Sequence, residues 1–140
     1  LQVPDDLSAR TGMLLGAHFA GSAIEHSMLG ATHACANPLT ARYGTVHGVA
    51  IGLLLRHVVQ WNASDSNGTA LRYKELDRDL PEVLASFVKA ARFPLGLQAS
   101  GISPDDLNEL AADAATQWTG TFNPRTFDVR GARSIYELAW

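Results

Sequence analysis

An all-α fold is predicted by three features of the sequence. Apolar residues recur at helical spacing in most segments, and no segment shows the sustained two-residue alternation of a half-buried strand. Two prolines also stand where a first helical turn tolerates them. With 140 residues, the chain is long enough for one domain with a hydrophobic core and too short for two. We therefore expect residues 1–140 to form a single all-helical domain.

The first helix is expected to begin after Pro4-Asp5-Asp6, because acidic side chains can accept hydrogen bonds from the free amides of a first turn. From Leu7 to Ile24 the residues are mostly apolar, with glycines and alanines between the large side chains. A helix that carries so few charges is expected to be buried on most sides.

A second helix is predicted from about Met28 to Asn37, because Pro38 lacks an amide hydrogen and disfavours helix at the residue before it. Residues 37–46 should then contain a turn. A third helix, starting near Thr45 or Val46, would carry His47 in its first turn, followed by an apolar segment and a polar loop at 62–68. Further helices are predicted at about 69–76, 81–91, 104–118 and 128–139.

Composition narrows the possible functions. The chain has 46% hydrophobic and 18% charged residues and a net charge of -3, which is typical of a soluble globular protein and unfavourable for binding nucleic acid. The longest apolar stretch ends at Arg56 and is too short to cross a membrane. No leader peptide is recognised, and the single Cys35 cannot form an internal disulfide, so we expect a cytoplasmic protein in which Cys35 is a buried, inert thiol.

All five histidines lie within the first 57 residues, which suggests a metal or proton-transfer site. If one helix ran through residues 18–33, then His18, His26 and His33 would share a face. The alternative is that His18 and His26 bond to backbone groups and that residues 27–30 interrupt the helix. His33 and His47 are expected on different helices, which a helix-turn-helix reversal can bring together without the spacing requiring it.

Two segments resemble the signature of iron-containing alcohol dehydrogenases. They read Gly30-Ala-Thr-His33-Ala-Cys-Ala-Asn-Pro38-Leu and Tyr43-Gly-Thr-Val-His47-Gly-Val-Ala. The resemblance extends to Ser103-Pro-Asp-Asp106, Asn123-Pro-Arg125 and Ile135-Tyr-Glu-Leu-Ala-Trp140, so it covers essentially the whole chain. It implies the carboxy-terminal helical bundle of that family, which belongs to the dehydroquinate synthase-like superfamily.

The resemblance also implies a metal site with His33 and His47 as two of its ligands. In the family, an aspartate and another histidine from an earlier helix complete the site, and an upstream α/β domain binds most of the NAD or NADP. Neither part is present here, and no G-x-G-x-x-G segment occurs. A divalent metal, iron or zinc, would polarise the oxygen of a small alcohol or aldehyde substrate.

Three further positions follow from the same resemblance. Asn37 stands where many members carry a histidine thought to relay protons, and an amide has no accessible titration. Either Asn37 ends a helix before Pro38 or it contacts the substrate. His26 and Thr119 fall near positions that line the cleft of the family.

The main hypothesis is therefore that this chain is part of a metal-dependent, NAD(P)-linked alcohol dehydrogenase or carbonyl reductase, and that it is inactive alone. One alternative is a non-catalytic helical module of the same fold that serves subunit association. The partner could then be a second copy of the chain in a homo-oligomer. Another is an enzyme like a maleylacetate reductase or a glycerol dehydrogenase. In each case exposed apolar surface is expected where the missing N-terminal domain would pack.

Overall fold

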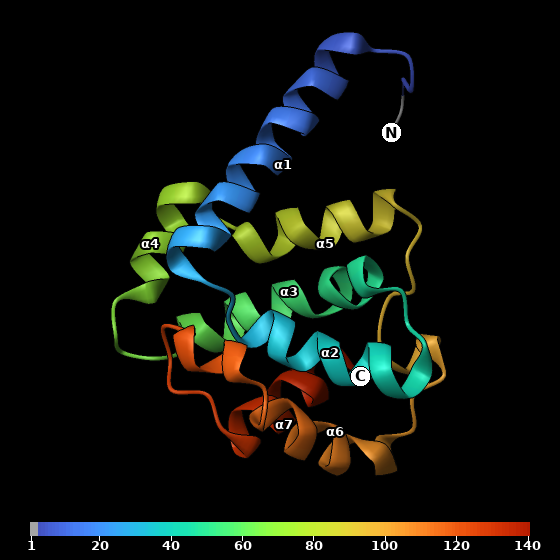
Figure 1. The fold of residues 1–140 in the computed structure, drawn as a ribbon, viewed down its shortest axis with the longest axis vertical. Coiled ribbons are helices and arrows are strands. Elements are labelled where there is room, and N and C mark those ends of the chain that lie inside the picture. The colour runs from blue at the N-terminus through green and yellow to red at the C-terminus, as the bar shows by residue number, and fades with distance from the viewer. Residues whose placement is uncertain (1–2) are drawn as a thin grey trace.

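The computed structural model describes residues 3–140, and all the regular structure in this range is helical (Figure 1). This confirms the predicted fold class. The α-helices are α1 (Leu7–Ser27), α2 (Ala31–Tyr43), α3 (His47–Ala63), α4 (Thr69–Leu76), α5 (Leu80–Ala90), α6 (Leu107–Ala115) and α7 (Val129–Ala139). Three short 3-10 segments join them: η1 (Gln98–Ser100), η2 (Pro104–Asp106) and η3 (Trp118–Phe122).

The core lies between α2, α3, α6 and α7, with α5 packed along α3 (Figure 1). Its largest fully buried side chains include Leu39, Leu54, Leu110 and Tyr136. The Tyr136 hydroxyl donates to the carbonyl oxygen of Cys35 at 2.6 Å and so ties α7 to α2. Cys35 is itself fully buried, which confirms the expected burial, and this burial raises the pKa of its thiol.

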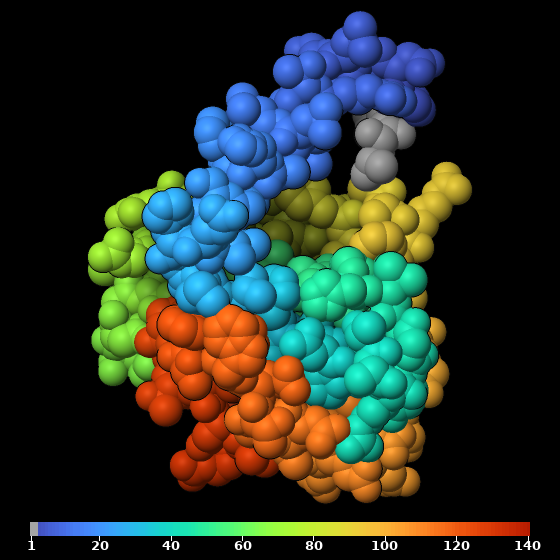
Figure 2. All heavy atoms as spheres, viewed as in Figure 1, coloured from blue at the N-terminus to red at the C-terminus, as the bar shows by residue number. Residues whose placement is uncertain are grey.

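Helix α1 stands away from this body, as Figure 2 shows for its blue atoms. Its start is as predicted, because the Asp6 side chain accepts from the Ala9 amide at 3.0 Å. The expected burial is wrong, since α1 has no buried residue within the described chain. Helices α2 to α7 fill their own core, and no other described element packs extensively along α1. Its exposed large apolar side chains are Leu7, Met13, Leu14, Leu15, Phe19 and Ile24.

Helix α1 ends at Ser27 because Met28 takes a positive φ of 62°, a conformation that a helix cannot continue. His18 and His26 therefore belong to α1, whereas His33 belongs to α2. The hypothesis of a single helical face that carries all three histidines is wrong, and the predicted interruption at residues 27–30 is confirmed.

Helix α2 continues through Pro38 to Tyr43, so the predicted end at Asn37 is wrong. An internal proline costs a helix about 3 kcal/mol through a lost hydrogen bond and a steric clash. Burial of Pro38 and Leu39 in the core offsets this cost. The helix ends instead at Gly44, whose φ of 65° is left-handed and whose amide donates to the Thr40 carbonyl at 3.1 Å.

The remaining helices follow the predictions with one exception. Helix α4 has the predicted bounds, and α3, α5 and α7 agree within one or two residues. The segment predicted as one helix at 104–118 is divided into η2, α6 and, after Gln117, η3. The Thr116 hydroxyl donates to the Asp113 carbonyl at 2.7 Å, a local bond that competes with continuation of α6. No helix of residues 3–140 is long and apolar enough to cross a membrane.

Candidate metal centre

The two histidines of the predicted ligand pair lie side by side. His33 is in the first turn of α2, and His47 is the first residue of α3. Residues 44–46 return the chain beside α2, so that the two ring centroids lie 5.4 Å apart with an angle of 46° between the ring planes. The structure therefore brings together two imidazoles that the spacing alone left unconnected.

The surroundings of His33 favour the neutral form of its ring. His33 is half-buried, whereas His47 is exposed. Burial lowers the pKa of His33, and the repulsion from a protonated His47 lowers it further. A neutral imidazole is the form that binds a divalent metal, so the environment of His33 prepares it as a ligand at neutral pH.

The separation of the rings fits one shared metal ion. With a nitrogen-to-metal distance of about 2.1 Å, roughly 1.2 Å from ring centroid to nitrogen and a tetrahedral angle, the two centroids would be about 5.4 Å apart. The observed 5.4 Å is close to this value. Within residues 3–140, however, no group of three or more His, Cys, Asp or Glu side chains could hold a metal. The described chain thus offers a pair of ligands and not a closed site.

The start of α2, which carries His33, is fixed by a pair of asparagines. The Asn123 side chain accepts from the Ala31 amide at 3.3 Å, where α2 begins. Asn123 also donates to the side-chain oxygen of Asn62 at 2.8 Å, and Asn62 donates back at 3.3 Å. Asn62 is only 2% exposed and donates in addition to the Tyr73 hydroxyl at 3.0 Å. These bonds hold the turn that bears His33 against α3.

Asn37 lies four residues after His33 on the same face of α2. Its side-chain amide donates to the side-chain oxygen of Gln117 at 2.9 Å. Asn37 does not end the helix, so of its two predicted roles the helix-terminating one is wrong. Gln117, in the link between α6 and η3, was not identified from the sequence, where nothing marks a residue 80 positions away as a partner.

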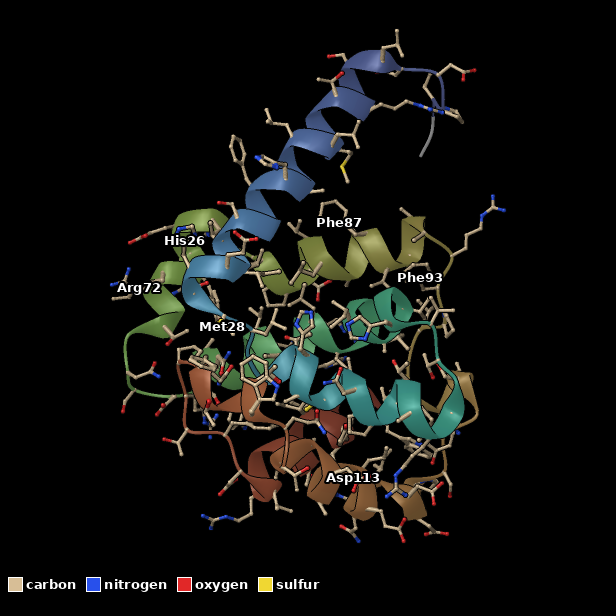
Figure 3. The ribbon with its side chains drawn as sticks, in the orientation of Figure 1. His26, Met28, Arg72, Phe87, Phe93 and Asp113 are labelled. Atoms are coloured by element: carbon tan, nitrogen blue, oxygen red, sulfur yellow. The ribbon has the colours of Figure 1, made fainter. Side chains whose placement is uncertain are left out.

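The two predicted cleft residues differ in their surroundings. His26 is exposed on the last turn of α1, and its ring nitrogen Nδ1 lies 2.7 Å from the Ser22 carbonyl oxygen of the same helix (Figure 3). Thr119 in η3 is 4% exposed, and its hydroxyl oxygen is buried without a hydrogen-bond partner in the described part of the chain. Segment η3 packs against α2, so Thr119 lies on an element that adjoins the helix of His33.

Comparison with known proteins identifies the family. Residues 1–140 match the pattern described as the Fe-containing alcohol dehydrogenase family, C-terminal. The chain belongs to the iron-containing alcohol dehydrogenase family. As a member, it is 30% identical to the lactaldehyde reductase of Escherichia coli strain K12 over 99% of its length. It is also 32% identical to the phosphonoacetaldehyde reductase of Streptomyces viridochromogenes over 91% of its length.

A solved structure shares the fold of this iron-containing alcohol dehydrogenase chain. A crystal structure of 1,3-propanediol oxidoreductase superposes on this chain with a TM-score of 0.68 at 22% sequence identity. The superposed part is 81% of this chain and 33% of the oxidoreductase chain. The chain spans 40% of the lactaldehyde reductase and 36% of the phosphonoacetaldehyde reductase. The family is one of oxidoreductases, and the matched part is its C-terminal helical portion.

Proposed function

We propose that this chain is the metal-binding portion of a metal-dependent, NAD(P)-linked alcohol dehydrogenase or carbonyl reductase. The observation that supports this most directly is the His33–His47 ring pair, 5.4 Å apart, in a chain of the iron-containing alcohol dehydrogenase family. His33 and His47 would hold a divalent ion, iron or zinc, through neutral imidazole nitrogens. When bound, such an ion supplies Lewis-acid polarisation of a substrate oxygen.

The other half of the proposed enzyme is an upstream domain. The relatives are about two and a half times as long as this chain, since it spans 40% of the lactaldehyde reductase. We propose that an upstream nucleotide-binding domain provides the remaining metal ligands and binds NAD or NADP. The exposed apolar side chains of α1 support this arrangement, because a soluble protein rarely leaves such a surface uncovered.

The proposed substrate is a small alcohol or aldehyde. The two relatives named above are reductases of aldehydes, lactaldehyde and phosphonoacetaldehyde. In this chain, Asn37 lies one helical turn after His33 and is hydrogen-bonded to Gln117. The two side-chain amides can position a substrate oxygen by hydrogen bonding. Because an amide does not titrate, Asn37 would position the substrate and would not relay a proton.

A second function is supported by α1. An amphipathic or apolar helix that stands free of its domain can serve subunit association, either with a second copy of the chain or in a non-catalytic module of this fold. A variant of the main proposal is maleylacetate reductase chemistry, since the chain is 27% identical to maleylacetate reductase 1 of Cupriavidus pinatubonensis over 74% of its length.

The metal-binding part of the proposal is tested by anaerobic calorimetry with Fe²⁺ and Zn²⁺ on the 140-residue chain. We expect weak, saturable binding of one ion per chain, because only two ligands are present. His33→Ala and His47→Ala should each abolish it. His18→Ala, which removes an exposed histidine of α1, is the matched control and should leave binding unchanged. Binding that survives both ligand variants would refute the proposed pair.

The catalytic part is tested in a polypeptide that carries both the upstream domain and this chain. We expect oxidation of NADH or NADPH by a small aldehyde that requires the metal and is lost in His33→Ala and His47→Ala. A two-domain polypeptide that neither retains metal nor turns over any aldehyde, yet forms a stable oligomer through α1, would favour the association module instead.

A further inference from the structure

A cavity of about 200 Å³ lies between α3 and α5. Its walls are formed by Gly52, Arg56 and His57 from α3, by Ala85 and Val88 from α5, and by Leu95 from the loop that follows. This is roughly the volume that six or seven water molecules occupy in liquid water. The cavity therefore suits a ligand of about six or seven heavy atoms. The walls are mostly aliphatic, and the polar groups come from two neighbouring residues of α3.

The cavity has room because α3 carries a glycine where α5 approaches it. A Cβ atom on Gly52 would lie 3.3 Å from a ring carbon of Phe93 and 3.8 Å from a methyl group of Val88. Figure 3 shows Phe93 just beyond the end of α5, next to α3. A larger residue at position 52 would take up the space that now remains between the two helices.

One polar group in the wall is a buried histidine with an unused ring nitrogen. His57 is 6% exposed, and the Arg56 guanidinium donates from Nε to its Nε2 at 3.0 Å. Since Nε2 accepts, the proton of a neutral ring is on Nδ1, which is buried and has no hydrogen-bond partner among residues 3–140. Burial and the adjacent Arg56 lower the pKa of His57 to about 4, although Gln60 opposes the shift, so the ring is neutral at pH 7.

The other polar group is the guanidinium of Arg56, which takes part in no ion pair within residues 3–140. Arg56 is half-buried and uses Nε for His57. The ion pairs found within residues 3–140 involve Arg42, Arg130 and Arg133, and none includes Arg56. A half-buried guanidinium that no described carboxylate pairs with, beside an apolar cavity, is suited to binding an anion from solution.

We propose that this cavity binds a small aliphatic monocarboxylate. The carboxylate is held by the terminal nitrogens of Arg56, beside the His57 ring, and the aliphatic tail packs against Ala85, Val88 and Leu95. Arg56 follows His47 by nine residues, about two and a half helical turns, and so points from the opposite face of α3. Binding is therefore expected to be independent of any metal at His33 and His47.

The proposal is tested with butyrate as the probe, titrated into the isotope-labelled 140-residue chain and followed by amide chemical shifts. Butyrate has six heavy atoms and one negative charge. We expect saturable shifts centred on the amides of Gly52 and Ala85, with millimolar affinity. Arg56→Gln should weaken binding at least tenfold. Arg72→Gln, which removes an exposed arginine of α4, is the matched control and should bind butyrate normally.

Two further measurements distinguish binding inside the cavity from non-specific attraction to the charge of Arg56. Ala85→Leu keeps Arg56 but fills the aliphatic part of the cavity, so it should also weaken binding at least tenfold while the helical circular dichroism is unchanged. Butyramide, which has the same shape without the charge, should not bind. Equal binding of butyramide, normal binding by Ala85→Leu, or equally strong shifts with inorganic phosphate would overturn the proposal.

Discussion

The asparagine pair beneath His33 can be tested by Asn123→Ala. The Asn123 side chain accepts hydrogen bonds from the Ala31 amide and from Asn62, and it donates to Asn62 and to the Arg125 carbonyl. After the substitution, Asn62 keeps its bond to the Tyr73 hydroxyl, but its own side-chain oxygen loses the donor at 2.8 Å. Because Asn62 is 2% exposed, that oxygen then lies in a largely buried position without its donor.

The expected cost is the sum of two effects. Leaving a buried acceptor without a partner costs about 1–3 kcal/mol. Loss of the side chain that caps the first turn of α2 costs about 1 kcal/mol. The free energy of unfolding should therefore fall by about 2–4 kcal/mol, a large part of the stability of a domain of this size.

The assay is urea unfolding followed by circular dichroism, with a double-mutant cycle that includes Asn62→Ala. The double variant should be clearly more stable than the sum of the two single effects predicts, since the second truncation removes the orphaned partner. Asn108→Ala, at an exposed position of α6, serves as the control and should change stability by less than about 0.5 kcal/mol. A single-variant loss as small as that of the control, or strictly additive effects, would refute the reasoning.

Three further outcomes are expected. Gly131→Ala should destabilise the chain by about 1–3 kcal/mol in urea unfolding, because the new Cβ would lie 2.5 Å from a ring carbon of Trp61, which cannot move freely. The pKa of His57 is about 4 in the folded chain, against 6.5 for an unperturbed histidine. Between these two pH values the unfolded chain binds more protons than the folded chain. The free energy of unfolding should therefore fall by up to about 3 kcal/mol as the pH drops from 6.5 to 4. His57→Gln should flatten this part of the stability-pH curve. Replacing Leu15 and Phe19 with serine should reduce self-association in sedimentation velocity, and unchanged association would show that α1 is not the contact surface.

Helix positions could largely be read from the sequence because local signals and tertiary packing agree. Asp6 and Asp128 both accept from amides of the turn that follows, so two helix starts are specified by their own side chains. Pro38 is the counterexample. Its local preference is to end a helix, and only the surrounding core, which lies far away in sequence, explains why α2 continues.

The geometry of the candidate site was harder to predict from the sequence than the helix positions. The spacing of His33 and His47 did not require a contact, and the family resemblance suggested one that the structure then placed at 5.4 Å. The Asn37–Gln117 bond joins residues 80 positions apart, and the cavity beside Arg56 depends on how closely α5 approaches Gly52. Such features arise from packing between distant segments, which no local pattern encodes.

The free-standing α1 has a consequence for the rate at which backbone amides exchange with solvent. The described core is formed entirely by residues 31–139, so opening α1 breaks none of its contacts. A lone helix of 21 residues that includes Gly12, Gly16 and Gly21 is marginal in water. In this chain the α1 amides should therefore exchange within seconds to minutes, while those of α2, α3 and α7 exchange only on global unfolding. A domain or partner that binds α1 should therefore slow amide exchange along this helix and leave exchange in the core helices unchanged.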